Sequence, residues 1–156
     1  MEELAPVESG DLKTRIYSGA VTWMPQNWFL IQGTINYTSD QLDSGQSGSV
    51  LDISPNSSSD YWIGTLTLFL AVNEDTDGHL EYTAYEADNY FDNSEYTVPY
   101  GVGEKEDQLG IGVTRRFSDQ MMISAHYGYS TFESATTGHN TDYNAHTLYG
   151  RFAYRF

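Results

Sequence analysis

The side chains with the greatest capacity for chemistry in this sequence are charged, and the two signs are unevenly distributed. The chain carries 22 Asp and Glu residues against 7 Lys and Arg residues, for a formal net charge of −15. More than half of the carboxylates lie in or beside three polar stretches, near residues 39–60, 86–107 and 133–142. The acidic balance argues against nucleic acid as a partner, because phosphate backbones bind basic surfaces.

No metal centre or cofactor is expected. The stretch Asn73 to Gly78 has the opening spacing of a calcium-binding loop, but Ala84 occupies the twelfth position, where a bidentate carboxylate is needed. We therefore interpret the stretch as an acidic turn. The sequence has no Cys, which disfavours a structural zinc site, and its histidines lack metal-ligand spacing. These histidines are His79, His126, His139 and His146.

Hydrolysis is the one enzymatic chemistry for which the residue types are present. Ser130, His139 and Asp142 are the types that act as nucleophile, base and orienting carboxylate in hydrolases. However, no nucleophile elbow and no Gly-rich phosphate loop accompanies them. We therefore expect that the chain is not an enzyme.

The elements that must position these side chains are β-strands. Alternating apolar and polar residues, separated by turn-forming residues, predict seven strands. Tight turns near residues 25–27, 73–78 and 118–120 alternate with long polar loops, so the strands form a series of hairpins. The predicted strands cover about residues 13–24, 28–38, 60–72, 79–89, 108–117, 121–132 and 146–156.

The last predicted strand, His146 to Phe156, shows the alternation most clearly. One parity carries Leu148, Gly150, Phe152, Tyr154 and Phe156, and the other carries Thr147, Tyr149, Arg151, Ala153 and Arg155. The two faces of such a strand suit two different solvents. The nearly apolar run from Tyr61 to Val72 is about half as long as a membrane-crossing helix requires, so the pattern favours strands over helices.

This segment resembles the C-terminal strand of bacterial outer-membrane β-barrel proteins. In those proteins the barrel-insertion machinery recognises a terminal Phe that follows apolar residues at every second position, here Phe152, Tyr154 and Phe156. The resemblance covers only residues 146–156. The residues leave open a second interpretation, the half-buried edge strand of a soluble β-protein.

The resemblance implies an all-β fold: an antiparallel transmembrane β-barrel, or a portion of one, in a bacterial outer membrane. About seven strands would be joined by short periplasmic turns and long acidic extracellular loops. Residues 12–156 would form the barrel, and residues 1–11 a polar N-terminal segment. The implied partners are outer-membrane lipid, lipopolysaccharide and the barrel-insertion machinery.

The resemblance also implies a general function. We expect a porin-like passive conduit for polar solutes, or a sleeve for a partner protein. The alternative is a structural or adhesive barrel with a plugged lumen, whose acidic loops bind ions or surfaces. The residues expected to line the lumen are Glu81, Thr83, Tyr85, Thr114, Arg116, Ser124, His126, Tyr149 and Arg151.

The charged residues are expected to make one end of the lumen acidic and the other end basic. Arg115, Arg116, Arg151 and Arg155 lie toward the short-turn end, opposite the acidic loops. Such an axial field favours cations at the loop end and anions at the other. The alternative is that the loop carboxylates are solvated surface charge, bridged by divalent ions to lipopolysaccharide phosphates. Arg115 has lipid-face parity and is expected to extend its charge to the interface.

Two features do not fit a simple closed barrel. Glu86 shares the parity of the apolar residues Leu80 and Tyr82, so either a β-bulge shifts the register or Glu86 lies at the outer rim. The strand number is odd, whereas bacterial single-chain barrels have an even number. We therefore expect the remaining strands of a larger barrel, or other protomers, to pair with the first and last strands.

Overall fold

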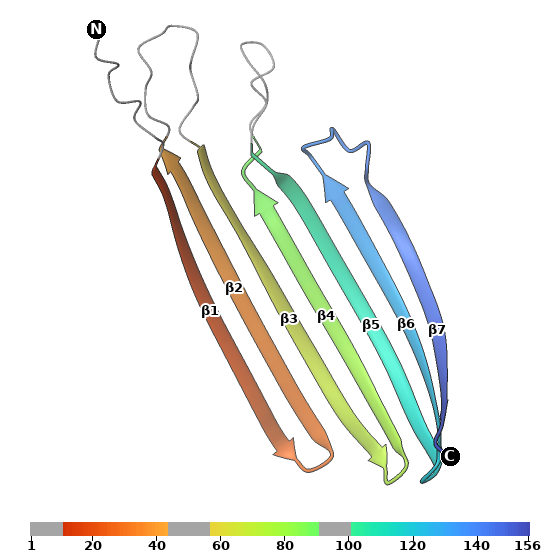
Figure 1. The fold of residues 1–156 in the computed structure, drawn as a ribbon. Coiled ribbons are helices and arrows are strands. Elements are labelled where there is room, and N and C mark those ends of the chain that lie inside the picture. Colours follow the sequence, from red (N-terminus) through yellow and green to blue (C-terminus); the bar gives the residue numbers. More distant parts are fainter. Residues whose placement is uncertain (1–10, 44–56, 91–100) are drawn as a thin grey trace, which may run out of the picture.

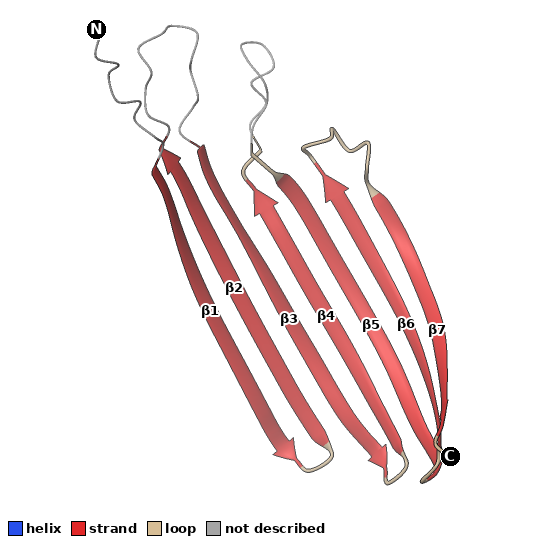
Figure 2. Cartoon of the chain, viewed as in Figure 1, coloured by secondary structure: helices blue, strands red, loops and turns tan. Residues whose placement is uncertain are grey.

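The protein is all-β in the computed structural model, which describes residues 11–43, 57–90 and 101–156. Seven antiparallel strands form one open sheet in sequence order, β1 to β7 (Figures 1 and 2). No helix occurs in these residues, so none is long and apolar enough to cross a membrane. The strands are β1 Asp11–Gln26, β2 Phe29–Asp43, β3 Ser57–Asn73, β4 Thr76–Asp88, β5 Gly103–Ser118, β6 Met121–Ser134 and β7 Tyr143–Tyr154.

The three predicted tight turns are confirmed, and all lie at the same end of the sheet (Figure 1). Each leaves two residues between strands, 27–28, 74–75 and 119–120. The register shifts just before each turn, as β-bulges do where a hairpin tightens. In the middle turn the Asn73 side-chain oxygen accepts a hydrogen bond from the Asp75 N–H at 3.0 Å, which holds the chain in a turn.

Most strands are longer than predicted at the opposite end. β5 begins at Gly103 instead of residue 108, because Glu104 to Asp107 pair with both neighbouring strands although their sequence is highly polar. β7 runs from Tyr143 to Tyr154, so the expectation that the strand continues to Phe156 was wrong by two residues. The Arg155 N–H still donates to the Gln120 carbonyl at 2.9 Å, which anchors the end of the chain.

The register aligns side chains of one kind in rows across the whole sheet. One row takes a residue from every strand, and all seven are hydrophobic: Trp23, Ile31, Leu68, Leu80, Ile111, Tyr127 and Leu148. The adjacent row, on the other side of the sheet, is polar or glycine throughout: Thr22, Gln32, Thr67, Glu81, Gly110, Gly128 and Thr147. We call the two sides the apolar face and the polar face.

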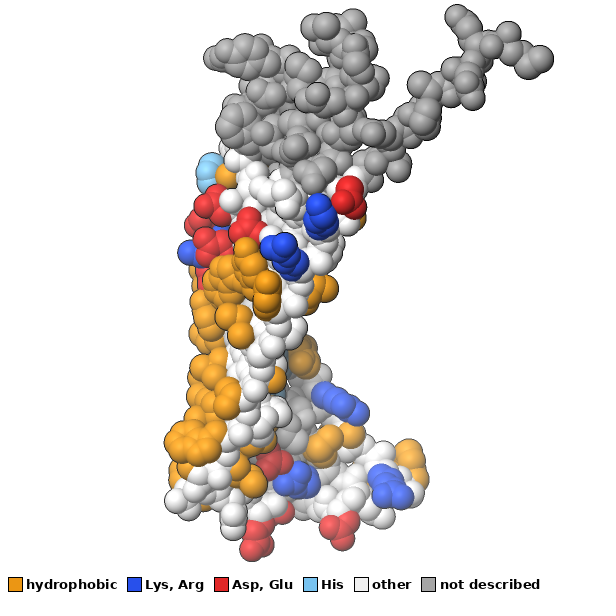
Figure 3. All heavy atoms as spheres, turned by 90° about the vertical axis from the view of Figure 1, so that its left-hand side faces the viewer, with side chains coloured by type: hydrophobic (Ala, Val, Ile, Leu, Met, Phe, Trp, Pro, Cys, Tyr) orange, Lys and Arg blue, Asp and Glu red, His pale blue; other side chains and the backbone are white. Residues whose placement is uncertain are grey.

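The apolar face is exposed. Ala87 is the only buried hydrophobic residue in the described part of the chain, whereas Trp23 is 59% and Leu148 79% accessible. In Figure 3, hydrophobic side chains form a stretch along one side of the sheet, with charged side chains gathered toward its ends. A sheet with this much exposed apolar surface requires a partner phase or a partner protein.

Glu86 lies near the long-loop end of the sheet, and the register there has no bulge. It pairs with Trp62 on one side and Lys105 on the other, two residues before β4 ends. Asp107, also on the apolar face near this end, accepts a hydrogen bond from the Tyr82 hydroxyl. The apolar stretch is therefore bounded by a polar rim on the long-loop side.

The long acidic loops lie largely outside the described residues. Asp52, Asp92 and Glu95 belong to this part of the sequence, as does nearly all of the predicted N-terminal segment at residues 1–11. Asp11 itself begins β1, pairing with Asp43.

Candidate functional site on the polar face

All nine residues predicted to line a lumen lie on the polar face. On β4, Glu81 and Thr83 oppose Thr67 and Thr65 of β3, and Tyr85 opposes Ile63. Thr114, Ser124 and Arg151 form one row across β5, β6 and β7. His126 opposes Tyr149 in the next row, and Arg116 opposes Met122.

Hydrogen bonds between neighbouring strands tie these polar side chains together. The hydroxyl oxygens of Thr65 and Thr83 are 3.2 Å apart, and those of Thr114 and Ser124 are 2.9 Å apart. The Thr67 hydroxyl donates to Glu81 at 3.5 Å. Because these groups satisfy one another across the strands, the polar face holds its side chains in a fixed arrangement.

A hollow of about 340 Å³ lies over β4 to β7 and is lined chiefly by this face. Its floor is a pair of glycines, Gly110 and Gly128, which oppose one another across β5 and β6. Because neither carries a side chain, the sheet surface is depressed between rows of larger groups. The other lining residues are Glu81, Glu106, Gln108, Leu109, His126, Tyr129, Ser130, Tyr143, Thr147 and Tyr149.

A row of rings borders the hollow on the short-turn side. The His79 and His126 ring centroids are 5.3 Å apart, and the His126 and Tyr149 rings stack at 4.8 Å. Gly112 lies between the two histidines in this row and makes their approach possible. A Cβ at position 112 would overlap the His79 imidazole, whose Nε2 would lie only 2.6 Å away.

Charges on the polar face are separated along the strands. Glu81, Glu104 and Glu106 lie from mid-strand toward the long-loop end, and Gln108 donates to Glu106 at 2.7 Å. Near the tight turns, Arg116 forms a 2.9 Å ion pair with Asp77. Arg151 forms no ion pair within the described residues. The polar face therefore presents carboxylates at one end and guanidinium groups at the other.

Arg115 and the C-terminal aromatics lie on the opposite, apolar side. The Arg115 guanidinium lies 5.4 Å from the centre of the Phe117 ring. Phe152 and Tyr154 oppose Ile123 and Met121, and the rings of Tyr154 and Phe156 meet edge to face at 5.1 Å. Phe152 and Tyr154 thus lie toward the tight-turn end of the apolar face, and Tyr154 and Phe156 are in ring contact.

Most residues of the hollow and its border were missed from the sequence, among them His79, Glu106 and Gln108. His79 shares the odd parity of Glu81, Thr83 and Tyr85 on β4. Glu106 and Gln108 share the even parity of Thr114 and Arg116 on β5, so the signal was present. Glu106 was excluded because the fifth strand was predicted to begin only at residue 108. The ring row itself depends on the pairing of His79, Gly112 and His126, which appears only once three strands are in register.

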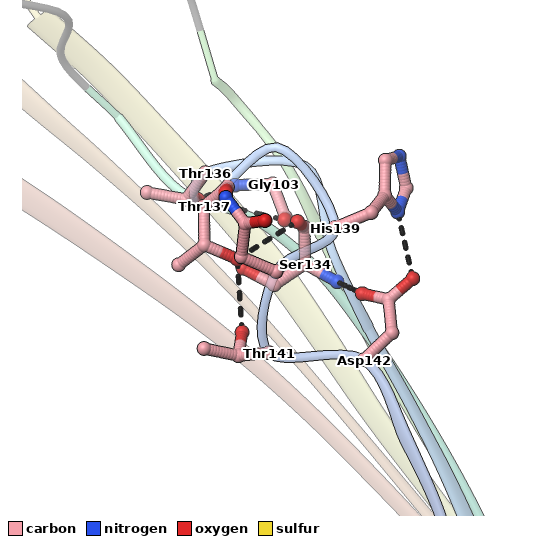
Figure 4. Close-up of polar contacts among 8 residues, drawn as sticks. Gly103, Ser134, Thr136, Thr137, His139, Thr141 and Asp142 are labelled. Atoms are coloured by element: carbon pink, nitrogen blue, oxygen red, sulfur yellow. Dashed lines mark hydrogen bonds and ion pairs between the residues drawn. The ribbon is translucent and has the colours of Figure 1, made fainter.

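The β6–β7 turn contains two of the three residues considered for hydrolysis. His139 Nδ1 lies 2.9 Å from a carboxylate oxygen of Asp142, whose other oxygen accepts the Ser134 N–H at 2.8 Å (Figure 4). Ser130 instead lies on the polar face of β6, opposite Gln108. The structure therefore brings His139 and Asp142 together but does not add Ser130 to them.

Asp142 acts as the anchor of this turn. Its hydrogen bond from the backbone N–H of Ser134 lowers the pKa of the Asp142 carboxyl, and the hydrogen bond and charge of His139 act in the same direction. Thr137 contributes two further contacts, donating to the Ser134 carbonyl at 3.2 Å and meeting the Thr141 hydroxyl at 2.9 Å. The turn is thus built by local polar contacts (Figure 4).

No group of three or more potential metal ligands occurs among residues 11–43, 57–90 and 101–156. The stretch from Asn73 to Gly78 consists of the end of β3, the tight turn at residues 74–75 and the start of β4, where Asp77 forms an ion pair with Arg116.

Comparison with protein-family models, with characterised proteins and with solved structures gave no match for this chain. What this chain does is therefore inferred from the apolar face and the polar face of its sheet.

Replacing Gly112 should disturb the ring row. We expect Gly112→Ala to lower the free energy of unfolding by about 1–3 kcal/mol, as overpacking does. The matched control is Gly78→Ala in β4, where the nearest atom to an added Cβ is 3.8 Å away. Removing the clash with His79→Ala should restore the stability of Gly112→Ala. Urea unfolding is measured for the unchanged protein, for Gly112→Ala, for Gly78→Ala and for the double variant with Gly112→Ala and His79→Ala. Equal losses of stability for the two single Gly substitutions would contradict this packing.

The β6–β7 turn should loosen at acidic pH. Because the pKa of Asp142 is lowered by folding, its stabilisation is present above the ordinary Asp pKa of about 3.9 and is lost as pH falls through the lowered value. The protection factor of the Ser134 amide, which is its intrinsic exchange rate divided by its measured rate, should therefore fall in that acidic range. Asp142→Ala should show the low protection factor at pH 7, whereas Asp119→Ala in the β5–β6 turn should not. Slow Ser134 exchange in Asp142→Ala would refute the anchoring role.

Proposed function

We propose that this chain forms part of the wall of a β-barrel in a bacterial outer membrane, where it acts as a passive conduit for polar solutes or a sleeve for a partner protein. The observation that supports the proposal is the pair of adjacent rows that cross all seven strands, one wholly hydrophobic and one wholly polar or glycine. In a membrane the first meets lipid and the second an aqueous lumen.

The dimensions of the strands also support this role. They contain 12 to 17 residues, whereas a tilted strand needs about 9–11 residues to cross the hydrocarbon core. The additional residues fall in the polar rim, where Glu86, Lys105 and Asp107 lie. Aromatic side chains border the apolar stretch: Tyr17, Tyr37 and Tyr129 toward the loops, Trp28, Phe117 and Tyr154 toward the turns. Such residues are typical of membrane interfaces.

The polar face supports selectivity for cations at its long-loop end. Glu81 and Glu106 border the hollow, and neither forms an ion pair within the described residues. Carboxylates on a concave, low-dielectric wall raise the local concentration of cations. Cationic and neutral polar solutes are therefore the proposed cargo.

A structural barrel with a plugged lumen is the second candidate. The row of rings from His79 to Tyr149 favours it, because side chains of this size fill the interior of a narrow barrel. Total strand number separates the two candidates, since about eight strands leave room only for side chains and larger barrels leave a channel.

Ion conductance tests the conduit. The protein, extracted from outer membranes with whatever strands accompany it, should give discrete, cation-selective conductance steps in planar bilayers. Glu81→Lys should reduce the ratio of cation to anion permeability, because the charge lies on the polar face. Lys105→Glu, a charge reversal on the other face, should leave the ratio unchanged. Silent bilayers would instead favour the plugged barrel.

The facing of the sheet can be tested at two neighbouring residues of β3. Leu68→Arg places a cation on the apolar face and should cost about 2–4 kcal/mol near the bilayer midplane. Thr67→Arg should be tolerated, because that side chain lies beside Glu81 on the polar face. Urea unfolding in lipid vesicles, with heat-modifiable gel mobility, reports both variants. A larger loss for Thr67→Arg would invert the assignment.

A further inference from the structure

The outer strands of the sheet each have one unpaired edge in the described chain. β1 pairs with β2 and β7 with β6, and no pairing joins β1 to β7. Figure 1 shows these two strands on opposite sides of the open sheet. The hydrophobic row also ends abruptly there, with Trp23 and Leu148 among its most accessible members. The hydrophobic row therefore reaches both edges of the sheet without a polar boundary.

Along residues 16–23 of β1 and 143–150 of β7, the two edges lack the features by which soluble proteins protect an edge strand. Such edges are short, bulged, or interrupted by Pro or inward-pointing charge. β1 pairs with β2 without a register shift from Asp11 to Trp23, and β7 pairs with β6 without any shift. Pro25 lies only at the turn end of β1, and residues 16–24 of β1 and 143–150 of β7 are free of Lys, Arg, Asp and Glu. These edges are suited to pairing.

Strand direction restricts what can pair with them. In an antiparallel sheet of seven strands the first and last run the same way. In Figure 1 the β1 arrow points to the tight-turn end, and β7 ends beside the C-terminus at that same end. In a ring of copies with one membrane orientation, β7 of one copy would lie beside β1 of the next and parallel to it. An even number of additional strands gives the same parallel junction, whereas an odd number makes every junction antiparallel.

We infer that the edges of β1 and β7 together bind one additional β-sheet segment with an odd number of strands. The segment alternates hydrophobic and polar residues. Its hydrophobic residues continue the row that ends at Trp23 and Leu148, and its polar residues continue the row that ends at Thr22 and Thr147. The inference rests on the proposed function and deepens it, since it specifies what completes the barrel.

The chain's own strands supply the test. Residues 29–88 contain β2, β3 and β4, so fusing this segment before residue 11 adds three strands in the correct directions. Residues 57–88 contain only β3 and β4, and their fusion is the matched even-numbered control. Each protein is folded into phosphatidylcholine vesicles, and backbone hydrogen exchange is followed strand by strand.

In the 156-residue chain, amides of β1 and β7 should exchange at least tenfold faster than those of β4. The three-strand fusion should slow exchange in both edge strands, and the two-strand fusion should slow it in β1 alone. Equal protection of β7 by the two fusions, protection by neither, or a monomeric 156-residue chain with protected edges would overturn the inference. Loss of protection in β3 to β5 within lipid would instead count against the proposed function.

Discussion

Strict alternation of side chains, kept in register across seven strands, is the constraint on which the rest of this structure depends. A slip of one residue between β2 and β3 would exchange Leu68 for Thr67 beside Ile31 and break both rows. The three register shifts all lie beside tight turns, outside the central rows. The hairpins can therefore tighten without disturbing the separation of hydrophobic from polar side chains.

The polar face shows how a sheet can be both rigid and hollow. Cross-strand hydroxyl pairs and the ion pair of Asp77 with Arg116 fix its side chains, while Gly110, Gly112 and Gly128 leave space above the backbone. The imidazoles of His79 and His126 lie close together because of Gly112. In the proposed conduit, these features would produce a fixed wall with a carboxylate-rich region on one side of the ring row and a guanidinium-rich region on the other.

Much of the fold was predictable because its signal is local. Alternation located all seven strands, and Pro, Asn, Asp and Gly located the turns. Strand ends were less predictable, since residues 103–107 are highly polar and resemble a loop until their two partners are known. The nine lining residues could be chosen by parity, but the approach of His79 to His126 depends on contacts between strands. The role of Asp142 was likewise hidden, because its main partner is the backbone of Ser134.

The central claim is that neighbouring residues of one strand meet two different phases, and cysteine scanning of residues 64–71 in β3 tests it most directly. The chain contains no native Cys, so each single substitution reports without background. With the protein in lipid vesicles, a membrane-impermeant maleimide should label positions 65, 67, 69 and 71 rapidly and positions 64, 66, 68 and 70 slowly. Uniform labelling of all eight positions, or alternation in the opposite phase, would contradict the account.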